Sequence, residues 1–203
     1  MYKKVVSIIF CLIIGIITGA YINYWQTHQK LMIEDVQVEI IGEKNENVDL
    51  QLENISNALN TKYLQNLVNK IIITDKDLND SEKSPSKNEK IAGMVDYDKK
   101  IIYISSKYGK VDTVFHEFYH LLDDSFRTDT STCISENAEF KQLVNSNIDL
   151  LKSKLHFLHY ELSSYSEIFV GIMQRYQSNI YNLKEDFPDM YIYIQEIVKE
   201  SQK

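Results

Sequence analysis

The chain has 203 residues, of which 44% are hydrophobic and 25% charged, a composition typical of one globular domain with room for a small appendage. The formal net charge is −7, and every acidic residue lies beyond residue 30, so the later part of the chain is strongly acidic. Because an acidic surface repels phosphate backbones, nucleic acid is excluded as an expected partner.

The N-terminus has the pattern of an export signal. Two lysines precede the uncharged run VVSIIFCLIIGIITGAYI over residues 5–22, which is also long enough to cross a bilayer once. The small residue Ala20 marks a cleavage site, whereas Trp25 suits the outer interface of a retained anchor. Residues 1–25 are therefore predicted to be a signal peptide or a membrane anchor, and the sequence leaves both alternatives open.

The charge pattern also predicts where the protein works. If the N-terminal lysines stay inside the cell, the remainder faces outward, as a secreted or cell-surface protein. Lysine far outnumbers arginine, and this bias favours an AT-rich bacterial genome. Because Cys11 lies in the apolar run, Cys133 is the only cysteine in the remainder, and no internal disulfide is expected there. We expect a monomer whose fold rests on its core or on a metal.

The first half of the chain has strand patterns after a polar start. Residues 26–34 are predicted to be a spacer, followed by one domain over residues 35–203. Branched residues in alternation or in short runs predict strands, and apolar residues three or four apart predict helices. These patterns predict a strand at 35–41, one or two helices within 49–69, a buried strand at 70–74, an exposed loop at 79–90 and two strands within 91–105.

Helical patterns dominate the second half. One helix is predicted to run to about Asp124, and the stretch HFLHYELSSYS (156–166) is ambiguous. The other predicted helices cover roughly 135–154, 167–176, and a last segment from near Pro188 to near Glu200. The predicted fold class is therefore α+β, with a small mixed sheet followed by helices.

One of these helices carries a motif with a chemical meaning. The segment TVFHEFYHLLDD (113–124) has the order H-E-x-x-H, with His116, Glu117 and His120. Histidines four apart on a helix lie on one face, so both can reach one zinc ion at about 2.0–2.1 Å. Glu117 then lies beside the metal, where it can take a proton from water. The alternative is a satisfied histidine pair on a half-buried helix, but the apolar flanks favour a metal as partner.

A catalytic zinc needs a third protein ligand and an open position. The metzincin pattern is excluded, because Asp123 and Phe126 stand where it requires glycine and histidine. The best candidate is Glu167 on a later helix. Ser164 and Glu167 also form the pattern of a capping box, so spacing alone leaves ligand and cap open.

Three further residues are weaker candidates near this motif. His156 and His159 rival Glu167 as the third ligand, although surface or loop histidines are the commoner interpretation. Asp123 lies one turn after His120 and either accepts a hydrogen bond from an imidazole or ends the helix.

The segments HEFYHLLDD and YELSSYSEIF, followed by a final helix, resemble the catalytic domain of the anthrax lethal factor-like and Pro-Pro endopeptidase family. The resemblance covers roughly residues 90–200 and implies a zincin-like fold and a zinc peptidase of the gluzincin type. It implies one Zn²⁺ per chain, bound by His116, His120 and Glu167, with Glu117 as general base. It also implies that Tyr160, seven residues before Glu167, stabilises the oxyanion of the reaction.

The chain departs from this family at two positions. Tyr119 stands where the family commonly has glycine, and Gly171 stands where it commonly has an acid that supports a histidine ligand. The predicted function is a secreted or membrane-tethered zinc endopeptidase, whose extended protein or peptide substrate adds to the sheet edge within residues 91–97. One alternative is a degenerate member that binds zinc or peptide without turnover, and another is an interaction domain without metal.

Overall fold

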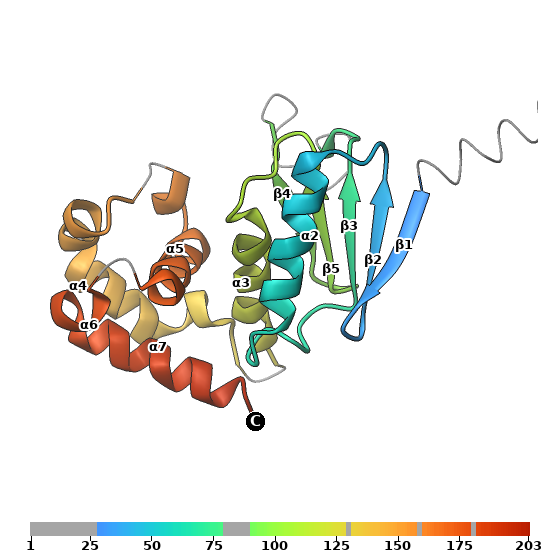
Figure 1. Ribbon diagram of the computed structural model, residues 1–203. Coiled ribbons are helices and arrows are strands. Elements are labelled where there is room, and N and C mark those ends of the chain that lie inside the picture. Colours follow the sequence, from blue (N-terminus) through green and yellow to red (C-terminus); the bar gives the residue numbers. More distant parts are fainter. Residues whose placement is uncertain (1–27, 79–89, 129–130, 158–159, 180–181) are drawn as a thin grey trace, which may run out of the picture.

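The computed structural model describes residues 28–78, 90–128, 131–157, 160–179 and 182–203. Within these ranges the chain has an α+β fold, in which the first half forms one mixed sheet and the second half is helical (Figure 1). This confirms the predicted fold class and the predicted order of sheet before helices.

The sheet has five strands in the order β1-β2-β3-β5-β4. The central strands β2, β3 and β5 are parallel, whereas β1 and β4 pair antiparallel with their neighbours at the two edges. The strands predicted at 35–41, 70–74 and within 91–105 are confirmed, and β4 is an edge strand. The bounds are β1 (His28–Ile33), β2 (Val36–Ile41), β3 (Lys70–Thr74), β4 (Gly93–Asp96) and β5 (Ile101–Ser105).

Strand β1 corrects the prediction of a polar spacer over residues 26–34. Its sequence HQKLMI has only a weak alternation of polar and apolar residues. An edge strand needs one hydrogen-bonded neighbour and one buried face, so this weak pattern suffices. Leu31 and Ile33 pack against the core, while Met32 between them is exposed. Lys30 therefore shares the solvent side of the strand with Met32, whereas the exposed Gln29 lies on the face of Leu31 and Ile33.

Helices α2 (Glu46–Leu59) and α3 (Thr113–Ser125) cover one face of the sheet (Figure 1). Helix α2 forms the crossover between the parallel strands β2 and β3. Alternate side chains of a strand point to opposite faces of the sheet, so every second residue of a strand faces these helices. The Asn45 side chain accepts a hydrogen bond from the Val48 N–H at 3.0 Å and so caps α2. The central strands contribute fully buried side chains to the core: Val38, Ile40, Ile71, Ile73, Ile102 and Ile104.

The segment 49–69 holds one helix, which is one of the two alternatives that the sequence predicts. After α2 ends, the N–H groups of Thr61, Leu64 and Leu67 each bond the carbonyl three residues earlier, at 2.8–3.2 Å. Such tight turns bring Leu64 and Val68 into the core without a second helix.

The C-terminal helices pack on the side of α3 that faces away from the sheet (Figure 1). Among them α5 packs directly against α3 and is buried along Ile168–Met173. The predicted helices are confirmed with shifted bounds, and the short α6 is an addition. The elements are η2 (Ile134–Glu136), α4 (Ala138–Lys154), η3 (Tyr160–Leu162), α5 (Tyr165–Ser178), α6 (Leu183–Asp186) and α7 (Pro188–Glu200).

Two predictions concern residues outside this description. The signal peptide or anchor at residues 1–25 lies there, and so do residues 79–89 of the predicted loop. In the part of the chain that the structure describes, no helix combines the length and apolar character needed to cross a bilayer.

Candidate metal centre

Helix α3 carries the H-E-x-x-H motif between the sheet and α5. It packs against β4 and β5 on one side and against α5 on the other. Residues three or four apart lie on the same side of a helix, because the helix turns once about every 3.6 residues. Five hydrophobic side chains of α3 are buried in the core: Val114, Phe118, Tyr119, Leu121 and Leu122. His116 and His120 lie one turn apart on a stripe that reaches the N-terminal end of α5.

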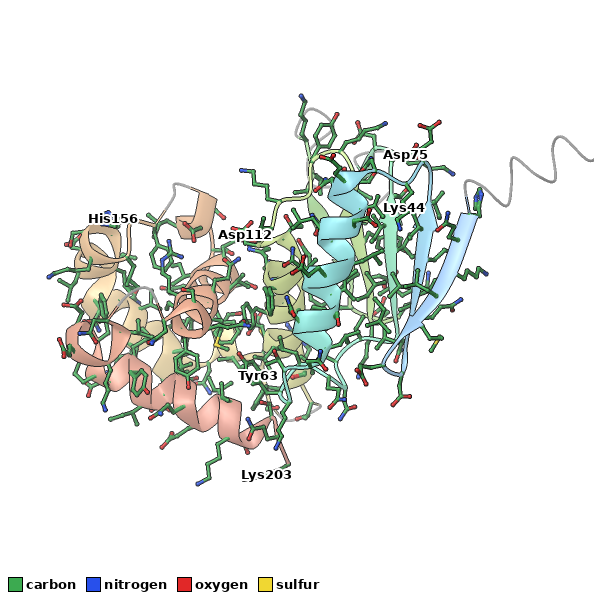
Figure 2. The ribbon with its side chains drawn as sticks, in the orientation of Figure 1. Lys44, Tyr63, Asp75, Asp112, His156 and Lys203 are labelled. Atoms are coloured by element: carbon green, nitrogen blue, oxygen red, sulfur yellow. The ribbon has the colours of Figure 1, made fainter. Side chains whose placement is uncertain are left out.

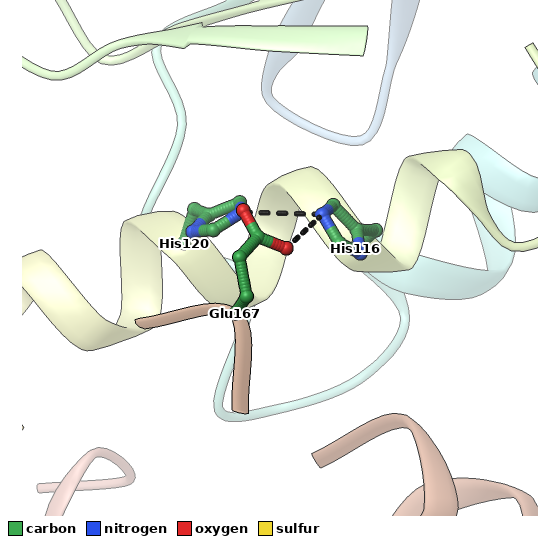
Figure 3. Close-up of side chains that lie close together, drawn as sticks. All are labelled: His116, His120 and Glu167. Carbon is green, nitrogen blue, oxygen red and sulfur yellow. Dashed lines mark hydrogen bonds and ion pairs between the residues drawn. The ribbon is translucent and has the colours of Figure 1, made fainter. Parts of the chain in front are cut away.

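The two imidazoles meet the Glu167 carboxylate at the start of α5 (Figure 3). Nε2 of His116 lies 3.4 Å from Oε2 of Glu167, and Nε2 of His120 lies 3.3 Å from Oε1. The two Nε2 atoms are 3.2 Å apart. Tetrahedral ligands at about 2.0–2.2 Å from a zinc ion lie roughly 3.3–3.6 Å from one another. The three side chains therefore have the chemistry and nearly the spacing of a tetrahedral zinc site.

The charges in this cluster are mutually dependent. Burial disfavours the ionised carboxylate of Glu167, but the His116 and His120 side chains outweigh it and hold the Glu167 pKa well below its usual value. Burial likewise opposes the charged form of His116, but Glu167 and Glu117 raise the His116 pKa. Oε2 of Glu167 is buried, and its 3.4 Å contact with Nε2 of His116 does not have the geometry of a hydrogen bond. A buried carboxylate oxygen without a hydrogen bond is costly, and a metal ion would satisfy it.

The cap and the ligand prove to be compatible roles for the start of α5. Ser164 is the N-cap, and its hydroxyl accepts a hydrogen bond from the Glu167 N–H at 3.1 Å. The Glu167 side chain turns toward the histidines instead of returning to Ser164, so the reciprocal half of a capping box is not its role here. The backbone of Glu167 thus completes the cap while its carboxylate remains available to a metal.

Glu117 lies in a buried position under the edge strand. Its side chain is 6% exposed, and burial raises its pKa, opposed by the nearby His120 and His116. Gly93 in β4 lies close to this side chain, because an added Cβ atom there would lie 2.5 Å from Oε1 of Glu117. Gly93 pairs with Ile104 of β5, whose side chain is fully buried, so the missing side chain of Gly93 would point into the same layer. Glu117 occupies the space that this glycine leaves.

The other sequence candidates lie elsewhere. Tyr160 begins η3, but its side chain is outside the described part of the structure. His156 is exposed among the C-terminal helices, on the side away from the sheet, and is not part of the metal cluster (Figure 2). His159 lies outside the described residues.

Tyr119 and Gly171, the two residues that differ from the pattern of the lethal factor-like family, do not face the metal cluster. Tyr119 is fully buried, and its hydroxyl lies 3.5 Å from that of Tyr63 near the end of α2. Gly171 faces the segment before α5, where an added Cβ atom would lie 2.5 Å from Phe157 and 2.9 Å from Glu161. Tyr119 therefore packs toward α2, and Gly171 makes room for a buried ion pair between Glu161 and Arg175.

Sequence reasoning missed three residues around this centre. Gly93 contacts Glu117, and Ser166 contacts His120. Tyr97, in the turn after β4, is 44% exposed, and partial desolvation of its phenol together with the Glu117 carboxylate raises its pKa. The sequence predicts a turn at residues 97–100, but it does not predict the direction in which the side chains of this turn project.

Comparison with known proteins adds no relative to this description: no family model matches the chain, and no curated protein matches it.

Proposed function

We propose that the chain is a zinc endopeptidase of the gluzincin type with a zincin-like fold. The observation that carries this proposal is the meeting of His116, His120 and Glu167 at separations of 3.2–3.4 Å, beside a buried Glu117. The resemblance of the two short segments to the lethal factor-like family supports the same assignment of roles.

Each residue has a distinct task in this proposal. Zinc bound by the three ligands would supply a Lewis acid for a peptide carbonyl and lower the pKa of water toward roughly 7. Glu117 accepts the proton of the attacking water and returns it to the leaving amine. Burial supports this exchange, because a carboxylate whose pKa is raised toward the working pH can both take and release a proton. Tyr160 would donate its phenol O–H to the developing oxyanion.

The edge strand β4 provides a place for the substrate. It is the last strand of the sheet in the described ranges, next to β5, and it lies over the helix that carries Glu117. An extended protein or peptide substrate can add to such an edge as a further strand, which presents its carbonyls in register above the metal.

Metal content and cleavage test the proposal together. We expect about one zinc ion per wild-type chain, by elemental analysis, and a large loss in Glu167→Ala. The Glu117→Gln variant should keep its zinc but cleave a peptide library at least about 100-fold more slowly, because it can no longer accept a proton. Wild-type cleavage by Glu117→Gln would contradict the assigned mechanism, and zinc retained by Glu167→Ala would contradict the third ligand.

The second candidate is a degenerate member that binds zinc or peptide without turnover. Its motivation is the loss of the family acid at Gly171, which leaves no carboxylate four residues after Glu167 to support a histidine. The packing of Tyr119 toward Tyr63, away from the metal cluster, argues against a blocked site. Zinc-dependent cleavage of any member of the library would exclude this candidate.

We also propose that the protein acts outside the producing cell. This proposal rests only on the sequence pattern of residues 1–25. A C-terminally tagged chain should appear in the medium or in the membrane fraction, where external protease degrades it. Full retention in the soluble cytoplasmic fraction would contradict this location.

A further inference from the structure

His120 reaches beyond the metal cluster through its second ring nitrogen. Nε2 faces His116 and Glu167, while Nδ1 lies 3.2 Å from the hydroxyl oxygen of Ser166. Ser166 directly precedes Glu167 in the first turn of α5. One turn of helix therefore presents both a candidate metal ligand and a hydroxyl to the two sides of the same imidazole.

Ser166 is in turn bound to the buried side chain of Asp123, which is 4% exposed. The Ser166 hydroxyl donates to Oδ2 of Asp123 at 3.1 Å. Ser135 of η2 holds the same carboxylate from the other side, through its N–H to Oδ1 at 2.7 Å and its hydroxyl to Oδ2 at 2.6 Å. Three donors thus satisfy a carboxylate that α3 carries into the interior, and the network joins α3, η2 and α5.

The direction of these hydrogen bonds follows from the number of available protons. A serine hydroxyl has one proton, and in this network it is donated to Asp123. The Ser166 oxygen can then only accept from His120, so Nδ1 must carry a hydrogen. A neutral imidazole that is protonated at Nδ1 has its lone pair on Nε2, the atom that faces the cluster.

We propose that Ser166, held by Asp123, is a positioning residue that selects the metal-binding tautomer of His120. The inference rests on the proposed zinc site. It assigns to Asp123 an indirect role, since its carboxylate acts on the imidazole through a serine and not by direct contact. It also gives this chain a support for one histidine that does not depend on an acid at position 171.

The tautomer can be observed directly in the metal-free protein. In long-range ¹H–¹⁵N spectra of histidine-labelled protein, we expect wild-type His120 to carry its proton on Nδ1. Ser166→Ala should shift His120 toward the other tautomer or a mixture, and Ser166→Thr, which keeps the hydroxyl, should restore the wild-type spectrum. Ser178→Ala, the same change at the far end of α5, is the matched control and should leave His120 unchanged.

Zinc affinity provides the second readout, by competition with a chromophoric chelator. Loss of a hydrogen bond that orients a metal ligand typically weakens binding 10–100-fold, and we expect about this loss in Ser166→Ala and in Asp123→Asn. Ser166→Thr and Ser178→Ala should bind zinc close to the wild-type affinity.

Two results would overturn the inference: wild-type His120 without a proton on Nδ1 in the metal-free protein, or wild-type zinc affinity in Ser166→Ala. If Ser166→Ala does not fold, the wild-type spectrum and the affinity of Asp123→Asn decide between the same outcomes. A wild-type chain that binds no zinc would instead refute the proposed function, while the spectrum would still decide whether Ser166 sets the tautomer.

Discussion

Gly93 and Glu117 face each other at the edge of the sheet, and their close contact requires glycine at position 93. The Glu117 side chain is buried against position 93. Only glycine leaves room there for the carboxylate, since an added Cβ would lie 2.5 Å from Oε1 of Glu117. The glycine is required here by close approach and not by its backbone conformation. The position of Glu117, the proposed general base, therefore depends on the absence of a Cβ atom at Gly93 of β4.

We predict that Gly93→Ala slows peptide cleavage by about 10- to 100-fold without loss of zinc. The new methyl group displaces the Glu117 carboxylate, and a displacement of about 1 Å can cost on the order of 100-fold in rate. The three atoms nearest to the new methyl group all belong to Glu117, so His116, His120 and Glu167 should retain the metal. The measurements are the cleavage rate and the zinc content of the same preparation.

Met94→Ala is the control for Gly93→Ala, because the next residue of β4 projects to the opposite face of the sheet. It should cleave at nearly the wild-type rate. Equal rates for Gly93→Ala and the wild type would show that Glu117 tolerates displacement, and would contradict its positioning by this strand.

At the scale of an element, α5 is joined to the segment before it by Arg175. The Arg175 guanidinium donates to Glu161 at 2.7 Å, to the Leu155 carbonyl at 2.8 Å and to the Gly171 carbonyl at 2.9 Å. It also lies 4.2 Å from the centre of the Phe157 ring. Both side chains of the ion pair are largely buried, at 12% and 5% exposure. Gly171 allows this arrangement because any side chain there would occupy the same volume.

We predict that Arg175→Leu destabilises the protein by about 3 kcal/mol or more. Removal of one partner leaves the buried carboxylate of Glu161 without its guanidinium, and such losses typically cost about 3–5 kcal/mol. The free energy of unfolding would be measured by urea denaturation. The double variant Arg175→Leu/Glu161→Leu should recover part of the loss, because it removes the buried charge as well.

Additive effects of the two Arg175 and Glu161 substitutions would contradict a coupled pair. Lys152→Leu, which removes an exposed cation that pairs with Asp149 at 3.8 Å, is a matched surface control. It should change the free energy of unfolding by less than about 1 kcal/mol.

At the scale of the whole molecule, the candidate metal centre joins the two halves of the chain. Two ligands come from α3, which packs on the sheet, and the third comes from α5 among the C-terminal helices. An ion held there would cross-link these layers, and its binding free energy would add to the stability of the folded state.

We predict that zinc raises the thermal midpoint of the protein and that a chelator lowers it. A free zinc concentration of 100 times the dissociation constant stabilises a folded protein by about 2.7 kcal/mol. Scanning calorimetry with zinc and with chelator would measure the shift. Glu167→Ala should melt at the same temperature in both, and a wild-type midpoint that is insensitive to zinc would contradict a site shared between α3 and α5.

The local elements of this fold could largely be predicted from the sequence. The helix of the H-E-x-x-H motif follows from a period of about 3.6 residues, and the strands at 70–74 and within 91–105 follow from branched residues within single segments. The same is true of the side-by-side placement of His116 and His120, since their spacing of four residues defines a shared helical face. Strand β1 was missed because a polar edge strand hardly differs from a spacer in its pattern.

The sequence by itself therefore determined the α+β class, the elements and the histidine pair, because each depends on residues close together in the chain. Only the tertiary structure decided that Glu167 faces the histidines, that Gly93 makes room for Glu117, and that Ser166 connects Asp123 to His120. Each of these contacts joins segments that are distant in sequence. They exist because α5 packs against α3 and β4 lies at the edge of the sheet, and no periodicity within one segment encodes how two segments approach each other.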